Sequence, residues 1–112
     1  MTTYSESVAE VTDADFATEV LAAELPVLVK FTAEWCGPCR QLKPVLGAIA
    51  TEEAARLRIV EIDVDRNPET TLKYGILGTP TLMVFRSGEP VKSLIGARPK
   101  RRLLQELEDV LT

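Results

Sequence analysis

The segment VLVKFTAEWCGPCRQLKP, residues 27–44, contains the strongest indications of both the fold and the function of this chain. It contains the only two cysteines, Cys36 and Cys39, the only tryptophan, Trp35, and a lysine, Lys30, inside an apolar run. Its first part is β-branched and apolar, which is typical of a central strand covered on both faces by helices. Its second part begins an apolar repeat at three- and four-residue spacing that continues beyond the segment and indicates an amphipathic helix: Leu42, Val45, Leu46, Ile49 and Ala50. The two cysteines therefore lie where a strand passes into a helix.

Strand and helix patterns alternate outward from this segment to both ends of the chain. We expect Thr12 or Asp13 to cap the first helix. The order βαβαβαββα predicts an α/β fold with a central mixed sheet of about five strands flanked by about four helices. We interpret residues 1–112 as a single domain, with residues 1–6 as a flexible lead. The periodicity predicts strands at 7–11, 26–33 and 57–65, two antiparallel strands within 81–96 joined at 87–88, and helices at 12–24, 36–53, 67–75 and 99–111.

Composition excludes several function classes. The net charge of −4 argues against a general nucleic-acid binder. Residues 1–16 contain neither a basic leader nor an apolar stretch, and no run approaches the roughly 20 apolar residues of a membrane span. We therefore expect a cytoplasmic protein with no membrane partner, and in a reducing compartment a cysteine pair is more often catalytic or metal-binding than structural. A local basic cluster forms either a partner-facing patch or a solvated helix start: Arg98, Lys100, Arg101 and Arg102.

The spacing of Cys36 and Cys39 suits a reversible disulfide. Residues three apart on a helix have Cα atoms about 5 Å apart, and disulfides need about 4.4–6.8 Å. The two cysteines can therefore bond with little movement of the backbone. Closing so short a loop stabilises the fold by only about 2 kcal/mol, so the bond is better suited to being made and broken than to holding the fold together.

The position of Cys36 favours its thiolate. We expect the helix to begin at or just after Cys36, because Pro38 is tolerated in the first helical turn. Unpaired backbone N–H groups and the positive end of the helix dipole then point at this sulfur, and the thiolate is the reactive form of cysteine. Cys36 is thus the candidate nucleophile, and Cys39, one turn into the helix, the candidate resolving thiol. Trp35 either shields the site and contacts an incoming chain or is a core residue.

Zinc binding is the main alternative for a Cys-X-X-Cys pair. A structural zinc site usually has four protein ligands, and this chain has no other cysteine and no histidine. A monomer would have to complete the site with carboxylates or water, so we expect no metal. The absence of histidine also argues against a cysteine–histidine hydrolase.

The segment FTAEWCGPCR, with PVLVKF before it and KYGILGTPTLMVFRSGE after it, strongly resembles the thioredoxin family over about residues 8–111. The resemblance implies a thioredoxin fold and a protein thiol–disulfide oxidoreductase, in which Cys36 attacks a client disulfide and Cys39 resolves the mixed disulfide. It also implies that Pro80 is the family's cis-proline and that the backbone of Thr79 pairs with an extended client segment. The other residues that it places around the docking surface are Trp35, Gly37, Pro38 and Gly96.

The resemblance further implies the partners. A thioredoxin reductase, an NADPH-dependent flavoprotein, would restore the thiols, so NADPH and FAD act through that partner and no cofactor is bound here. Clients of the ribonucleotide reductase, methionine sulfoxide reductase or peroxiredoxin type are expected, and the chain is expected to be a monomer. Two alternatives stay open. One is an oxidant or isomerase, and the other is a non-catalytic module that uses the Trp35, Pro80 and Gly96 surface for docking.

Lys30 and Glu61 depart from the family pattern. Relatives usually carry a buried aspartate at the position of Lys30, thought to help deprotonate the resolving cysteine, and a lysine on the neighbouring strand, where this chain has Glu61. An unpaired buried charge is costly, so Lys30 must find a partner, lose its proton or reach solvent. We hypothesise a reversed pair beneath Cys36 and Cys39, in which Glu61 or a water accepts the proton of Cys39. The alternative is that Lys30 and Glu61 reach water independently.

Overall fold

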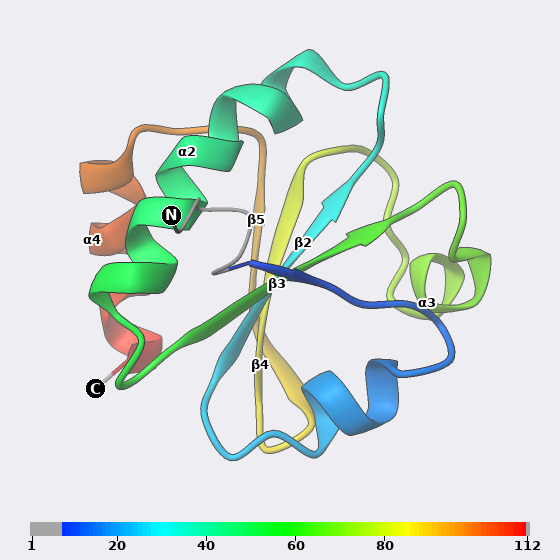
Figure 1. Ribbon diagram of the computed structural model, residues 1–112, viewed down its shortest axis with the longest axis horizontal. Coiled ribbons are helices and arrows are strands. Elements are labelled where there is room, and N and C mark those ends of the chain that lie inside the picture. Colours follow the sequence, from blue (N-terminus) through cyan, green and yellow to red (C-terminus); the bar gives the residue numbers. More distant parts are fainter. Residues whose placement is uncertain (1–7, 112) are drawn as a thin grey trace.

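The computed structural model describes residues 8–111, so the expected flexible lead at residues 1–6 lies outside it. The elements follow the expected order, and the sheet is mixed, with five strands in the order β1-β3-β2-β4-β5 (Figure 1). The fold is therefore the α/β arrangement that the sequence predicts. The strands are β1 (Ala9–Glu10), β2 (Val27–Thr32), β3 (Arg58–Asp63), β4 (Thr81–Arg86) and β5 (Glu89–Ile95). The helices are η1 (Ala17–Leu21), α2 (Gly37–Glu52), α3 (Pro68–Lys73) and α4 (Lys100–Leu111).

Strand β2 is the centre of the sheet, and every one of its residues except Thr32 is buried. It pairs in parallel with β3 and antiparallel with β4. The two outer strands extend the sheet on either side: β1 pairs in parallel with β3, and β5 pairs antiparallel with β4. A strand buried on both faces explains the nearly continuous apolar run in this part of the sequence.

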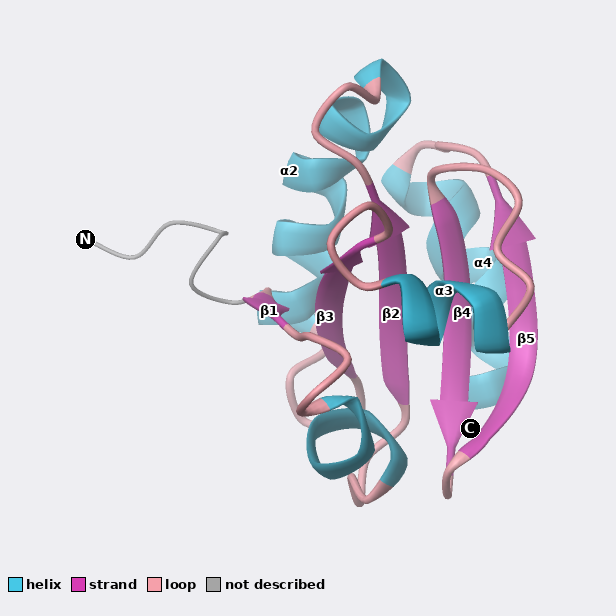
Figure 2. Cartoon of the chain, turned by 90° about the vertical axis from the view of Figure 1, so that its right-hand side faces the viewer, coloured by secondary structure: helices cyan, strands magenta, loops and turns pink. Residues whose placement is uncertain are grey.

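Helices cover both faces of the sheet. Helices α2 and α4 lie on one face, and η1 and α3 lie on the other (Figure 2). Alternate residues of β2 serve the two layers, since Leu28 packs with α2 and α4 whereas Val29 and Phe31 pack with η1. The side chains of α4 that face the sheet are buried or partly buried, as expected from the spacing: Leu103, Leu104, Leu107, Val110 and Leu111.

The first helix is much shorter than predicted. In the expected range 12–24, only Phe16 and the five residues of η1 are helical, and η1 forms a π-type turn closed by the Ala22 N–H on the Ala17 carbonyl at 2.9 Å. The expectation that Thr12 or Asp13 caps this helix is wrong, because no side chain caps η1. Asp13 has another role. Its carboxylate instead accepts the N–H groups of Glu69 and Thr70, at 3.1 and 2.9 Å, and so caps α3. The acid that looked like a local cap therefore joins two segments far apart in the sequence.

The basic cluster near the C-terminus is largely neutralised within the chain. Lys100 pairs with Glu52, while Arg98 and Arg102 both pair with Glu106. These contacts favour the interpretation as a helix start over a free patch for an acidic partner. Within residues 8–111, no helix is both long and apolar enough to cross a membrane.

We predict that Phe85→Ala lowers the free energy of unfolding by about 3–5 kcal/mol, because a large buried side chain leaves a cavity. Phe85 packs edge-on against Phe16 and Tyr74, with ring centroids 5.5 and 5.0 Å away. Urea unfolding of the oxidised protein measures the loss. Leu77→Ala is the control, since Leu77 is fully exposed and its removal should change stability by less than about 0.5 kcal/mol. Equal effects of the two substitutions would contradict the placement of Phe85.

Candidate active site

Cys36 occupies the N-cap position of α2. Its backbone is extended, with φ −93° and ψ 109°, and its Sγ accepts the N–H of Cys39 at 3.1 Å. Pro38 lies in the first turn, where its missing N–H costs nothing. The sulfur therefore lies at the positive end of the helix dipole and in contact with a backbone donor. Both effects stabilise negative charge on sulfur.

Cys36 and Cys39 form a disulfide across the first turn of α2. Their Cα atoms are 5.3 Å apart, close to the separation predicted from helix geometry. Both residues are buried and differ little in exposure, because Cys36 is 4% exposed and Cys39 is 2% exposed. Ala33 and Val64 pack against the pair. Within residues 8–111, no group of three or more potential ligands is placed to hold a metal ion.

Trp35 lies on the surface beside Cys36, so the interpretation of this residue as core is wrong. It is 71% exposed, and its indole N–H donates to Asp65 Oδ2 at 2.9 Å. Asp63 shapes the loop that presents Asp65, because its Oδ1 accepts the N–H groups of Asp65 and Arg66 at 2.8 and 3.2 Å. The hydrogen bond orients the ring and leaves its face free for contact. Sequence reasoning missed Asp65, since nothing in the local pattern connects it to a residue 30 positions away.

The Thr79–Pro80 peptide bond is cis, as the family resemblance implied. Gly96 lies beside it, because its N–H donates to the Pro80 carbonyl at 2.9 Å. Gly96 has φ +93°, in the left-handed region that favours glycine. Two exposed apolar side chains that sequence reasoning did not single out, Leu77 and Ile95, come from the segments on either side of this contact.

Lys30 and Glu61 form the expected ion pair. They are register partners on β2 and β3, and Lys30 Nζ lies 3.8 Å from Glu61 Oε1. At this distance the contact is a charge–charge interaction without a direct hydrogen bond. The Lys30 side chain is only 3% exposed, whereas that of Glu61 is 25% exposed. The alternative that both side chains reach water independently is therefore wrong for Lys30.

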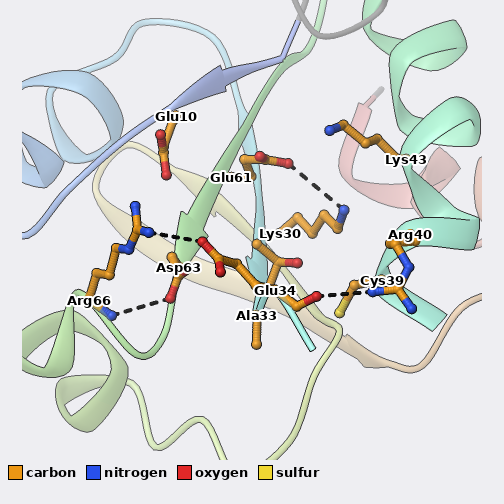
Figure 3. A pocket seen from close by; sticks show the side chains of 11 residues that line it. Glu10, Lys30, Ala33, Glu34, Cys39, Arg40, Lys43, Glu61, Asp63 and Arg66 are labelled. Atoms are coloured by element: carbon orange, nitrogen blue, oxygen red, sulfur yellow. Dashed lines mark hydrogen bonds and ion pairs between the residues drawn. The ribbon is translucent and has the colours of Figure 1, made fainter. Parts of the chain in front are cut away.

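The ion pair shares a cavity with Cys39. Lys30, Glu61, Lys43 and Cys39 all line a cavity of about 320 Å³ between α2 and the sheet (Figure 3). Burial lowers the pKa of Lys30, and repulsion by Lys43 lowers it further, whereas the Glu61 carboxylate opposes both effects. The cavity thus places a buried, destabilised cation and a partly solvated carboxylate on the Cys39 side of the disulfide.

Comparison with known proteins agrees with this geometry. The thioredoxin family model matches residues 7–109. The chain belongs to the thioredoxin family. It is 52% identical over 102 residues to a thioredoxin of Mycobacterium tuberculosis, covering 91% of this chain and 88% of that protein. It is 53% identical over 95 residues to a thioredoxin of Streptomyces clavuligerus, covering 85% of this chain and 88% of the relative.

A third relative is larger. A bifunctional thioredoxin reductase/thioredoxin of Mycobacterium leprae is 46% identical over 102 residues, which cover 91% of this chain and 22% of that protein. Membership of the family and the bonded Cys36–Cys39 pair together make this chain a thiol–disulfide oxidoreductase with a redox-active cysteine pair. The Trp-Cys-Gly-Pro-Cys segment, residues 35–39, contains this pair.

We predict that Lys30→Met stabilises the oxidised protein at neutral pH, by on the order of 1 kcal/mol, because it removes a costly buried charge. The pKa of Lys30 is lower in the folded state than its usual 10.5, so between these two values the unfolded state binds more protons. Wild-type stability therefore rises with pH across that window. The advantage of Lys30→Met should shrink as pH approaches about 10.5.

Urea unfolding of the disulfide form at several pH values measures this difference without interference from thiol titration. Lys73→Met, at an exposed position of α3, controls for the loss of one positive charge. A stability difference between Lys30→Met and wild type that stayed constant over this pH range would show that Lys30 carries no penalty of burial.

Proposed function

We propose that this chain reduces disulfides in client proteins as a single thioredoxin domain in the cytoplasm. The observation that carries the proposal is the position of Cys36, whose sulfur caps α2 and accepts the Cys39 N–H. This arrangement favours a thiolate at the N-terminal end of a helix. The small disulfide ring also returns readily to the dithiol, because it contributes little to stability.

The proposed reaction has two exchange steps. The Cys36 thiolate attacks one sulfur of the client disulfide, the client S–S bond breaks, and the other client sulfur leaves as a thiolate that takes a proton. Cys39 then loses its proton and attacks Cys36 Sγ in the mixed disulfide, which releases the second client thiolate. The client gains two electrons and two protons, and the cysteine pair is left as the disulfide seen here.

Docking of the client uses the surface around this disulfide. The proposed contacts are the exposed face of Trp35 and the backbone before Pro80, where Thr79 pairs with an extended client segment in the manner of an added strand. Gly96 keeps the surface open beside Pro80, to which it is hydrogen-bonded. Gly37 and Pro38 border the same surface from the first turn of α2.

Lys30 and Glu61 are proposed to tune the thiols. Glu61, or a water in the cavity that it lines, accepts the Cys39 proton, because its carboxylate is partly exposed and shares the cavity with Cys39. The Lys30 cation favours the thiolate. A stabilised thiolate stabilises the reduced protein and raises its reduction potential, by about 30 mV for every 1.4 kcal/mol. The observation that favours the second candidate function, an oxidant or isomerase, is the buried Lys30 in the cavity that Cys39 lines, and the midpoint potential distinguishes the two functions.

The proposed recycling partner is a thioredoxin reductase that carries the FAD and uses NADPH. Support comes from the Mycobacterium leprae relative, which is named as both thioredoxin reductase and thioredoxin. We propose that this chain is a monomer and binds no cofactor of its own. Its clients are proposed to be of the ribonucleotide reductase, methionine sulfoxide reductase or peroxiredoxin type.

We predict that Cys36→Ser abolishes insulin reduction in the presence of NADPH and a thioredoxin reductase, because no sulfur is left to attack the client. Cys39→Ser should also lose turnover but accumulate a covalent mixed disulfide with insulin, since the attacking thiol remains and the resolving thiol is gone. Non-reducing electrophoresis and mass spectrometry detect the adduct. An adduct formed by Cys36→Ser instead would reverse the assigned roles. If the double serine variant keeps the biological function of the chain although it cannot reduce insulin, that result would favour a non-catalytic docking module.

We predict that Lys30→Met raises the pKa of the Cys39 thiol and Glu61→Gln lowers it, because the first removes a cation and the second an anion from the shared cavity. The rate of alkylation against pH, followed by mass spectrometry for each thiol, measures both shifts. Lys30→Met should also lower the midpoint potential, by about 30 mV for each pKa unit. If neither variant moves a thiol pKa or the rate of insulin reduction, the pair does not act on the chemistry.

A further inference from the structure

Arg98 joins the end of β5 to α4 through a single guanidinium group. Its Nη2 donates to the Ile95 carbonyl at 2.6 Å, and its Nη1 donates to Glu106 Oε1 at 2.9 Å. The side chain is only 11% exposed, although it comes from the short connection between β5 and α4. Arginine side chains are rarely this buried unless they are paired, so the two contacts of Arg98 account for its burial.

The carbonyl that Arg98 binds lies on the open edge of the sheet. In an antiparallel pair, residues alternate between hydrogen-bonded and non-hydrogen-bonded positions. Gly96 donates to the Pro80 carbonyl, so its neighbour Ile95, opposite Thr81, occupies a non-hydrogen-bonded position and directs its carbonyl away from β4. Because β5 is an outer strand, no further strand takes up this acceptor. Arg98 donates a hydrogen bond to the Ile95 carbonyl from the side of β5 that faces away from β4.

These two contacts position the guanidinium, although not all of its N–H donors have a hydrogen-bond partner. Arg98 Nε is buried and has no hydrogen-bond partner among the residues that the structure describes. A buried donor without a partner carries a free-energy cost. The side chain is therefore held by the Ile95 carbonyl and the Glu106 carboxylate in spite of that cost.

We propose that Arg98 is a positioning residue for client docking, which holds the Ile95–Gly96 turn beside Pro80. The proposal rests on the proposed function, because it takes the Pro80 and Gly96 surface as the client site. Glycine has a flexible backbone, and Gly96 is restrained on one side by its hydrogen bond to the Pro80 carbonyl. Arg98 holds the preceding carbonyl on the other side. A turn that is already ordered loses less entropy when a client binds, so binding is tighter. Arg98 touches no reacting atom and takes no part in the exchange steps.

The test compares Arg98→Leu with Arg102→Leu. Arg102 is the matched control, because its Nε lies 3.9 Å from the same oxygen of Glu106 but its side chain is exposed on α4. Arg98→Leu should raise KM for insulin about threefold to tenfold, the range expected for freeing one ordered segment. Its kcat and its rate with a small aromatic disulfide, which does not need the docking surface, should stay as in wild type. Arg102→Leu should match wild type in all three measurements.

A second readout follows the turn directly. Amide hydrogen exchange at Gly96 in the oxidised protein without client should be faster in Arg98→Leu than in Arg102→Leu. Arg98→Lys keeps the charge but presents one ammonium group to two separated acceptors, so it should fall between wild type and Arg98→Leu. It also provides a folded test should Arg98→Leu fail to fold.

Two outcomes overturn the proposal. One is a KM for insulin that rises no more in the Arg98 variants than in Arg102→Leu, and the other is exchange at Gly96 equal to wild type. Failure of the proposed function looks different, because the wild-type protein itself would then not reduce insulin.

Discussion

The chemistry of this protein depends on one contact, the hydrogen bond from the Cys39 N–H to Cys36 Sγ in the first turn of α2. The contact exists because a central strand buried on both faces leads into a helix that begins immediately after Cys36. The strand determines where the helix starts, and the helix start places the sulfur at its positive end. The same turn brings the second cysteine within bonding distance. Reactivity and reversibility thus arise from one piece of local geometry.

The buried ion pair adds a second constraint on the same site. The two partners differ in their environment, because the lysine is almost fully buried whereas the glutamate keeps contact with water. Burial therefore lowers the pKa of Lys30. The structure thus places a buried cation and a partly exposed carboxylate in the cavity that Cys39 also lines.

The surface around the disulfide is assembled from segments that are distant in sequence, and each is held by a specific contact. Trp35 is oriented by Asp65, Gly96 is bonded to Pro80, and the end of β5 is joined to α4 through Arg98. None of these contacts forms part of the Cys-X-X-Cys turn itself. In the proposed function these contacts arrange the surface that a client binds before any sulfur reacts, so recognition and exchange chemistry depend on different contacts.

The order of the elements, the central strand, the start of α2 and the spacing of the cysteine pair could be predicted from the sequence, because strand alternation and helical periodicity are local properties of the chain. The Lys30–Glu61 pair was a hypothesis from the family resemblance, and it depends on the register of β2 and β3, which is a tertiary property. Only the tertiary structure decided that Trp35 is exposed, that Asp13 caps α3 instead of its own helix, and that Arg98 reaches the edge of β5. These outcomes depend on hydrogen bonds between groups that only packing brings together. A periodic pattern reports which face of an element is apolar, but not which distant donor meets which acceptor.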